Sequence, residues 1–107
     1  MPGPERLTSP PMPAYVIADV REAWDTEALQ EYRRRNTDAV AAHGGRFIVR
    51  GGEHEVFEGE WDTKRIVVME FPDVAAARAW WESEEYEAIK PIRRGASTTN
   101  IVLVDGA

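Results

Sequence analysis

Two carboxylates and one arginine stand next to short apolar runs in this sequence. Asp19 follows the apolar run Tyr15–Ala18, Glu70 follows Ile66–Met69, and Arg46 directly precedes a third run. If the runs that precede Asp19 and Glu70 are parallel strands of one sheet, these two carboxylates lie at the same edge, with Arg46 near them. One carboxylate can then act as a catalytic acid and base, while the arginine binds an anionic substrate. The alternative is a salt bridge at the end of the sheet, which is the commoner use of such residues.

Polar and aromatic side chains also fall on the two expected helices. Tyr32, Asn36 and His43 recur along one stripe of the first helix and can line a cleft between helix and sheet. Trp81 and Tyr86 add substrate-binding candidates from the second helix. Trp81 and the tryptophan before it diverge by about 100° on a helix, so one is expected in the core. The alternatives place the ring of Tyr32 in the core with its hydroxyl at the rim, and His43 in solvent at a helix C-terminus.

Cofactor and metal chemistry find little support in the residue types. The chain has no cysteine, which excludes disulfides and thiolate metal sites. His43 and His54 lack the spacing of a metal site, so no metal and no cofactor are predicted, although heme ligation by one of them is an alternative. The glycine pairs Gly44–Gly45 and Gly51–Gly52 do not belong to a phosphate-binding motif.

The net charge and the hydropathy of the chain indicate which kinds of partner the protein is expected to lack. The net charge of −6 disfavours a general nucleic-acid binder, and the basic cluster Arg33–Arg35 is interpreted as a solvent-exposed helix surface. No apolar run reaches the roughly 20 residues that cross a membrane, and no signal peptide is recognised. A cytoplasmic protein without membrane or nucleic-acid partners is the expectation.

The order of elements predicts one domain. Residues 1–11 hold prolines and little to bury, so a disordered leader is expected before a single domain over 12–107. Asp25 is the expected N-cap of a helix that reaches Ala42, and Asp73 and Ser83 are the expected caps of later helical segments that end or kink at Pro91. A short hairpin arm is expected over Glu53–Gly59. The strands are expected over 15–20, 47–50, 66–69 and 101–104.

This β-α-β-β-α-β order is the ferredoxin-like arrangement, an α+β fold with a four-stranded antiparallel sheet and helices on one face. The first and third strands are expected at the centre of the sheet. Their side chains are apolar on both faces, but the helices cover only one. A bare apolar face of several hundred Å² is rare on a monomer. The sequence therefore predicts a homodimer in which two sheets pack face to face.

Four segments carry a resemblance to a known family. They read MPAYVIADV (12–20), GGRFIVRGG (44–52), VFEGEW (56–61) and VVMEFPDVAAARAWWESEEY (67–86). In this order they resemble the bacterial domain-of-unknown-function family numbered 1330, in the dimeric α/β-barrel superfamily. The resemblance covers the chain from Met12 onward and implies a ferredoxin-like subunit and a dimeric barrel, but no reaction. It implies similar residue types at Tyr32, Arg46, Glu58, Glu70, Phe71, Ser83 and Tyr86. Trp81 stands where the family often has tyrosine, and Glu84 where it often has proline.

Three functions are compatible with the sequence. The first is a cofactor-independent enzyme that acts on a polar or aromatic organic acid, with Glu70 or Asp19 as acid/base, Arg46 as the anion clamp, and Tyr32 and Trp81 as cleft wall. The second is a non-catalytic ligand-binding or stress-associated dimer. The third is a heme-binding protein.

Overall fold

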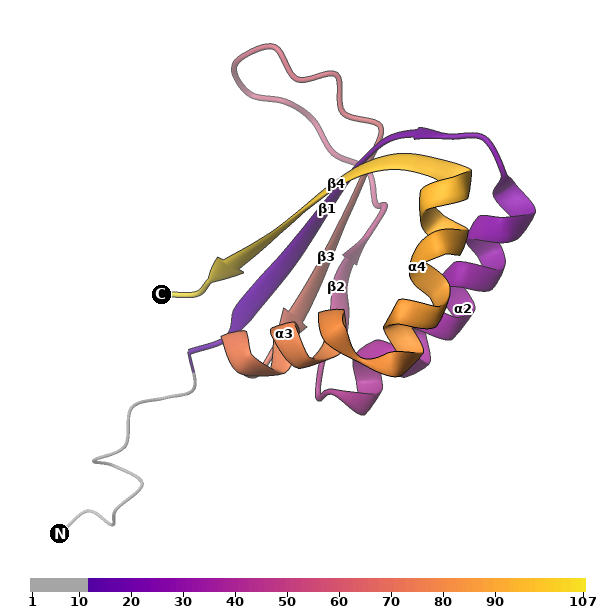
Figure 1. The fold of residues 1–107 in the computed structure, drawn as a ribbon. Coiled ribbons are helices and arrows are strands. Elements are labelled where there is room, and N and C mark those ends of the chain that lie inside the picture. The colour runs from indigo at the N-terminus through magenta and orange to yellow at the C-terminus, as the bar shows by residue number, and fades with distance from the viewer. Residues whose placement is uncertain (1–11) are drawn as a thin grey trace, which may run out of the picture.

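A four-stranded antiparallel sheet forms one layer of the molecule, and helices form the other (Figure 1). The structure is a computed structural model and describes residues 12–107, so the leader predicted over residues 1–11 lies outside the described residues. The strands are β1 (Ala14–Ala23), β2 (Arg46–Arg50), β3 (Arg65–Phe71) and β4 (Ser97–Asp105). Their order in the sheet is β2-β3-β1-β4, with β1 and β3 at the centre as predicted. This confirms the ferredoxin-like α+β fold.

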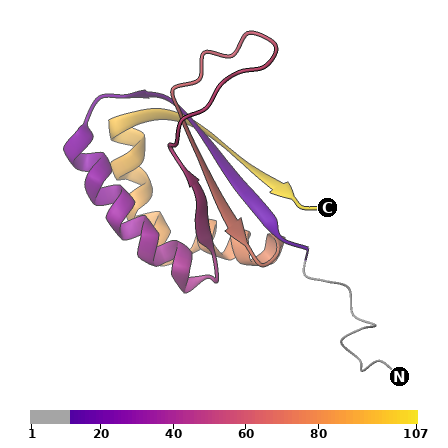
Figure 2. The same cartoon turned by 180° about the vertical axis from the view of Figure 1, so that it is seen from behind.

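The helices are α2 (Thr26–Ala42), α3 (Val74–Glu82) and α4 (Glu84–Ala96), and all lie on one face of the sheet (Figures 1 and 2). Three predicted caps are present. Asp25 accepts a hydrogen bond from the Ala28 amide, Asp73 from the Ala76 amide and Ser83 from the Tyr86 amide. These bonds satisfy amides that have no partner inside their helix, and so fix where each helix begins.

Two expected boundaries and one expected hairpin were wrong. Pro91 does not end the last helix, because α4 continues to Ala96; burial of Ile89 and Arg93 on either side of Pro91 accompanies this continuation. β4 has nine residues rather than four, because it pairs with β1 along its whole length. An arm does leave the sheet between β2 and β3, but residues 51–64 contain no paired strands.

The core lies between the helices and one face of the sheet. Its largest fully buried side chains are Trp80, Tyr86, Phe71, Ile89 and Val40. The ring centroid of Trp80 lies 4.2 Å from that of Tyr86 and 5.4 Å from that of Phe71. This aromatic cluster joins α3, α4 and β3, and so holds both layers of the fold together.

The other face of the sheet carries two ordered rows of side chains. Strand register places Val49, Val68, Ile17 and Val102 side by side across all four strands, and the next row is Arg46, Glu70, Tyr15 and Val104. Val102 is 52% exposed and Val49 is 40% exposed. An apolar row therefore crosses the face that the helices leave uncovered, as the sequence predicts.

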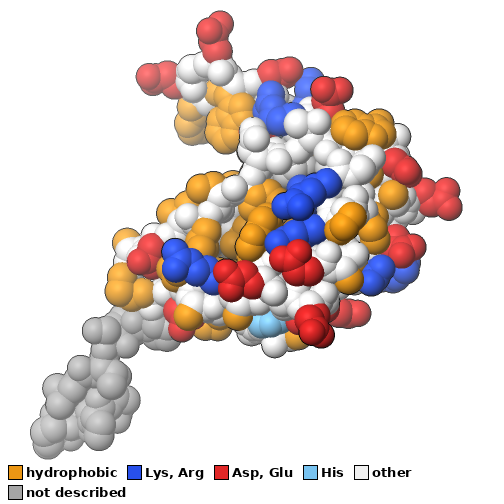
Figure 3. Space-filling view, in the orientation of Figure 1, with side chains coloured by type: hydrophobic (Ala, Val, Ile, Leu, Met, Phe, Trp, Pro, Cys, Tyr) orange, Lys and Arg blue, Asp and Glu red, His pale blue; other side chains and the backbone are white. Residues whose placement is uncertain are grey.

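The arm over residues 51–64 stands away from the body of the molecule across a notch, with hydrophobic side chains along it (Figure 3). Its apolar residues are Val56, Phe57 and Trp61, of which Phe57 is 91% exposed. Two hydrogen bonds of His54, to the Gly52 carbonyl and to the Thr63 hydroxyl oxygen, give the arm internal order.

Within residues 12–107, none of the helices is both long and apolar enough to cross a bilayer.

Candidate ligand-binding cleft

A small cavity of about 60 Å³ lies between the sheet and the helices. Its apolar wall comes from the helix-facing side of the sheet and from α2, and includes Leu29, Phe47, Val67, Met69 and Ile101. Its polar wall is dominated by arginine. Its lining, mostly apolar with a few convergent polar groups, is typical of small-molecule sites, but its volume is well below the roughly 300–1,000 Å³ of most such sites.

Four arginines from four different elements line this cavity: Arg33 of α2, Arg50 of β2, Arg65 of β3 and Arg93 of α4. No carboxylate lies among the lining residues. Within residues 12–107, none of the four guanidinium groups is in an ion pair. The chain as a whole has a net charge of −6, but the wall of this cavity carries four arginines and no carboxylate that could balance their charge.

Arg93 is the most buried of the four. The residue is 7% exposed, and its Nε is buried without a hydrogen-bond partner among the described residues. Its guanidinium carbon lies 6.0 Å from the ring centre of Tyr32. Its backbone carbonyl accepts a hydrogen bond from the Ser97 hydroxyl, which ties the end of α4 to the start of β4. A buried donor without a partner costs stability, so this nitrogen is an unusual feature of the cavity wall.

Arg65 is influenced by two of the other arginines. Burial and the neighbouring charges of Arg33 and Arg50 lower the pKa of Arg65. Arg50 stacks on Phe47, with its guanidinium carbon 3.9 Å from the ring centre, and donates to the Thr37 hydroxyl oxygen at 2.5 Å. These contacts orient the side chain of Arg50 but do not neutralise its charge.

Gly51 makes room for Arg65. It has φ of +74°, and a Cβ at this position would overlap the Arg65 guanidinium. The Gly51 amide donates to the Ile66 carbonyl, which closes the neck of the arm. A glycine is needed here both for its backbone conformation and for the close approach of the arginine.

Tyr32 and Asn36 of α2 line the cavity, and a hydrogen bond to a core side chain orients each of them. The Tyr32 and Tyr86 hydroxyl oxygens are 2.7 Å apart, and the Trp80 indole donates to Asn36 Oδ1 at 2.9 Å. Burial, followed by the adjacent Tyr86 hydroxyl, raises the pKa of Tyr32 well above its ordinary value. Tyr32 therefore stays protonated at physiological pH and can only donate or accept hydrogen bonds there.

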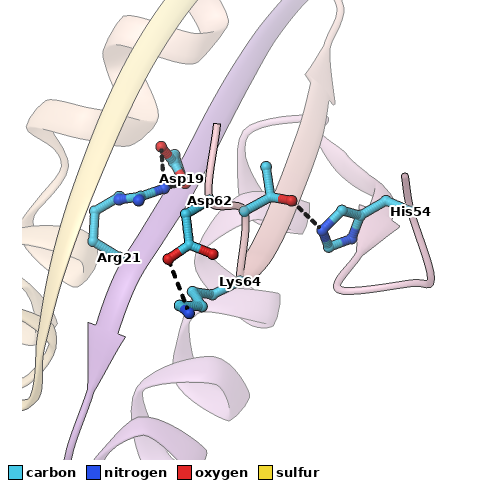
Figure 4. Close-up of polar contacts among 6 residues, drawn as sticks. Asp19, Arg21, His54, Asp62 and Lys64 are labelled. Carbon is cyan, nitrogen blue, oxygen red and sulfur yellow. Dashed lines mark hydrogen bonds and ion pairs between the residues drawn. The ribbon is translucent and has the colours of Figure 1, made fainter. Parts of the chain in front are cut away.

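The predicted convergence of Asp19 with Glu70 is wrong. β1 and β3 are neighbours and antiparallel, so Glu70 lies opposite Tyr15 while Asp19 lies opposite Ile66. The two carboxylates share the uncovered face, but four residues separate them along the strands, about 13 Å. Asp19 instead pairs with Arg21 at 3.1 Å, and the two side chains point toward one another in Figure 4. The reason is chain direction, because β3 returns antiparallel after the arm.

Arg46 does meet Glu70, with its Nε 2.9 Å from Glu70 Oε1. This pair lies on the uncovered face, outside the arginine-lined cleft, and the Arg46 side chain is 73% exposed. Burial and the Glu70 carboxylate raise the pKa of Tyr15, the third member of this group. The geometry matches the salt-bridge alternative, and Arg46 does not line the cleft between sheet and helices.

The remaining candidates lie apart from the cleft. Tyr86 is fully buried and contacts the cleft only through Tyr32. Trp81 borders a separate groove of about 260 Å³ beside β4, and the Lys90 ammonium lies 3.9 Å from its ring centre. His43 Nδ1 contacts the Ala39 carbonyl, and His54 lies in the arm. No group of three or more histidine, aspartate or glutamate residues in the described range is arranged to hold a metal ion.

Sequence reasoning missed the cleft arginines. Arg33 belongs to a cluster interpreted as solvent-exposed, but it falls beside Tyr32 on the inner stripe of α2 and lines the cavity. Arg50 and Arg65 flank the arm in the sequence, a signal that was available once the arm was recognised as a connection between neighbouring strands. Arg93 lies beyond Pro91, where the helix was expected to have ended.

Comparisons with solved structures support the fold. A Rhodopseudomonas palustris protein of unknown function aligns at 19% identity over 100% of this chain and 95% of that chain, with a TM-score of 0.69. The cofactor-independent oxygenase SnoaB from Streptomyces nogalater aligns at 16% identity over 90% of this chain and 94% of that one, with a TM-score of 0.57. A dimeric protein of unknown function with a ferredoxin-like fold, from Bacteroides fragilis, aligns at 13% identity over 88% and 95%, with a TM-score of 0.50.

A comparison with curated proteins finds no match. The family described as "Domain of unknown function (DUF1330)" matches residues 13–107, which is nearly the whole chain. The resemblance noted in the sequence is thereby confirmed, and the chain belongs to the DUF1330 family.

Proposed function

We propose that this protein binds a small organic acid in the cleft between its sheet and helices. The observation that carries the proposal is the set of four arginines around one cavity that has no carboxylate in its wall. Arginine guanidinium groups hold carboxylates through paired hydrogen bonds, and the buried Nε of Arg93 needs an acceptor. Leu29, Phe47 and Met69 offer apolar contacts to the rest of the ligand.

We further propose that the protein transforms this acid without a cofactor. Arginines in a cleft partly closed to water can stabilise negative charge that develops on a substrate, and the protonated Tyr32 hydroxyl can donate to it. Chemistry of this kind is compatible with the cofactor-independent oxygenase among proteins of similar fold. Glu70 and Asp19 lie outside the cleft. A role of either residue as a catalytic acid or base is therefore a proposal separate from the binding of the ligand by the arginines.

One observation favours a non-catalytic binding protein as the second candidate. The cavity wall contains neither a carboxylate nor an imidazole, the groups that most often serve as a general base. A protein that only holds its ligand needs the arginines but no base. Heme binding gains no such support, because neither His43 nor His54 lines the cavity.

The homodimer is proposed through the uncovered face of the sheet. The apolar row from Val49 to Val102 is complementary to a second copy of itself, since a twofold axis brings the same patch of both subunits together. The dimeric Bacteroides fragilis protein has the same fold. In such a dimer Glu70 and Asp19 face the space between the two sheets, whereas the arginine cleft stays within each subunit.

Thermal unfolding with sodium benzoate tests the proposed function. Benzoate is expected to raise the melting temperature more than sodium chloride of equal concentration, because it binds the folded state alone. A ligand at 100 times its Kd adds about 2.7 kcal/mol, or roughly 10 °C or more for a domain of this size. Arg93→Met should remove the benzoate effect, while Glu70→Gln should retain it. Equal benzoate effects in wild type and Arg93→Met would contradict binding in the cleft.

A further inference from the structure

We propose that the cleft takes an organic molecule with two separated anionic groups, such as a short dicarboxylate. This inference rests on the proposed function, because it names the class of acid that the same cleft selects. The sheet order separates the positive charge of the cleft into two groups. Arg50 and Arg65 belong to β2 and β3, whereas Arg93 of α4 shares the cavity wall with Ser97 and Thr99 of β4, on the other side of β1.

The Arg93 group lies against the helix layer. Arg93 of α4 is 7% exposed and lies beside Tyr32, and its Nε has no partner among the described residues. Ser97 and Thr99, which line the same cavity, have hydroxyl oxygens 3.0 Å apart. One carboxylate here would accept hydrogen bonds from Arg93 and from the protonated Tyr32.

The second group surrounds the base of the arm. Arg50 ends β2 and Arg65 begins β3, so the arm leaves and returns between them, and Arg33 faces them from α2. All three side chains line the same cavity, and burial followed by the charges of Arg33 and Arg50 lowers the pKa of Arg65. A carboxylate among them would remove this repulsion.

A single carboxylate leaves one of the two groups uncompensated. A bidentate pair with arginine engages one guanidinium, or at most two through its opposite edges. A monoanion at Arg93 would leave three mutually repelling arginines, and a monoanion at the arm would leave the buried Nε of Arg93 without an acceptor. The wall also offers Leu29, Val67 and Met69, which suit a hydrocarbon link between two acidic ends.

Titration calorimetry with matched pairs of acids tests the inference. The probes are malonate, succinate, glutarate and adipate, each compared with the monocarboxylate of equal carbon number at constant ionic strength. At least one dicarboxylate is expected to bind about tenfold or more tightly than its partner, since each additional arginine pair is a charge-assisted contact. In Arg65→Met this ratio should fall toward one, and in Arg34→Met, which removes an exposed charge from the same helix as Arg33, it should not change.

The outcomes separate the two proposals. A wild-type ratio near one throughout the series, with monocarboxylates binding and Arg93→Met preventing this, overturns the dianion and leaves the proposed function standing. A ratio that survives in Arg65→Met also overturns it, because the second anionic group would then not lie at the arm. Binding of none of the eight acids by the wild-type protein overturns the dianion, and it overturns the proposed function as well if benzoate also fails to stabilise the protein. Circular dichroism of each variant establishes that loss of binding is not loss of folding.

Discussion

Val102→Asp is expected to convert the protein from a dimer to a monomer of 12.1 kDa at micromolar concentration. Val102 is 52% exposed on edge strand β4, so the substitution costs the isolated subunit little, within about 0.5 kcal/mol. In the proposed dimer the same position lies in the apolar row that meets its twin. A buried carboxylate without a partner destabilises by about 3–5 kcal/mol, which weakens the dimer by more than about 100-fold.

Analytical ultracentrifugation of wild type and variant measures this difference. Gln30→Glu is the matched control, because it adds the same charge at an exposed position of α2, on the far side of the sheet from the row. The control should sediment as the wild type does. A wild-type protein that is already monomeric would refute the dimer, and a Val102→Asp variant that stays dimeric would place the interface elsewhere.

Trp80→Ala is expected to lower the free energy of unfolding by about 3–5 kcal/mol. Trp80 is 1% exposed, and its ring contacts Phe71, Trp81 and Tyr86. The substitution leaves a large cavity where three elements meet and removes the hydrogen bond to Asn36. Because small domains are stable by only about 5–15 kcal/mol, this loss removes a large share of the stability of the fold.

Urea denaturation followed by circular dichroism measures this effect. Trp61→Ala provides the comparison, since Trp61 is 49% exposed in the arm and contributes little to the core. Its free energy of unfolding should stay within about 0.5 kcal/mol of wild type. Similar losses in both variants would mean that the cluster around Trp80 does not dominate the stability of the core.

Local signals predicted the elements well, because each depends on a few neighbouring residues. Asp25, Asp73 and Ser83 act as helix caps, and the runs of consecutive apolar residues correctly predicted that the sheet has apolar side chains on both faces. Pro91 misled because tertiary burial of Ile89 and Arg93 outweighed a local rule.

The site could not be assembled in the same way. The expectation that Asp19 lies near Glu70 assumed that their strands are parallel. Because β1 and β3 are antiparallel, residues near the C-terminal ends of these strands lie far apart along the pair. The arginine cleft depends on four residues spread over 60 positions from Arg33 to Arg93, with no common spacing. Only the folded sheet and helices show that these four arginines converge on one cavity, and that no carboxylate lies in its wall.

The central claim is that the cleft holds positive charge that no group of the protein neutralises and that an anionic ligand would neutralise. The stability of Arg65→Met tests this claim most directly. If Arg65 repels Arg33 and Arg50, removing its charge in a dilute buffer without organic anions should raise the free energy of unfolding, by about 0.5 kcal/mol. The gain should shrink in 0.5 M sodium chloride, on the order of a screened interaction, and be absent in Arg34→Met. A loss of more than about 1 kcal/mol in Arg65→Met would contradict the account, because it would mean that Arg65 is already compensated within the fold.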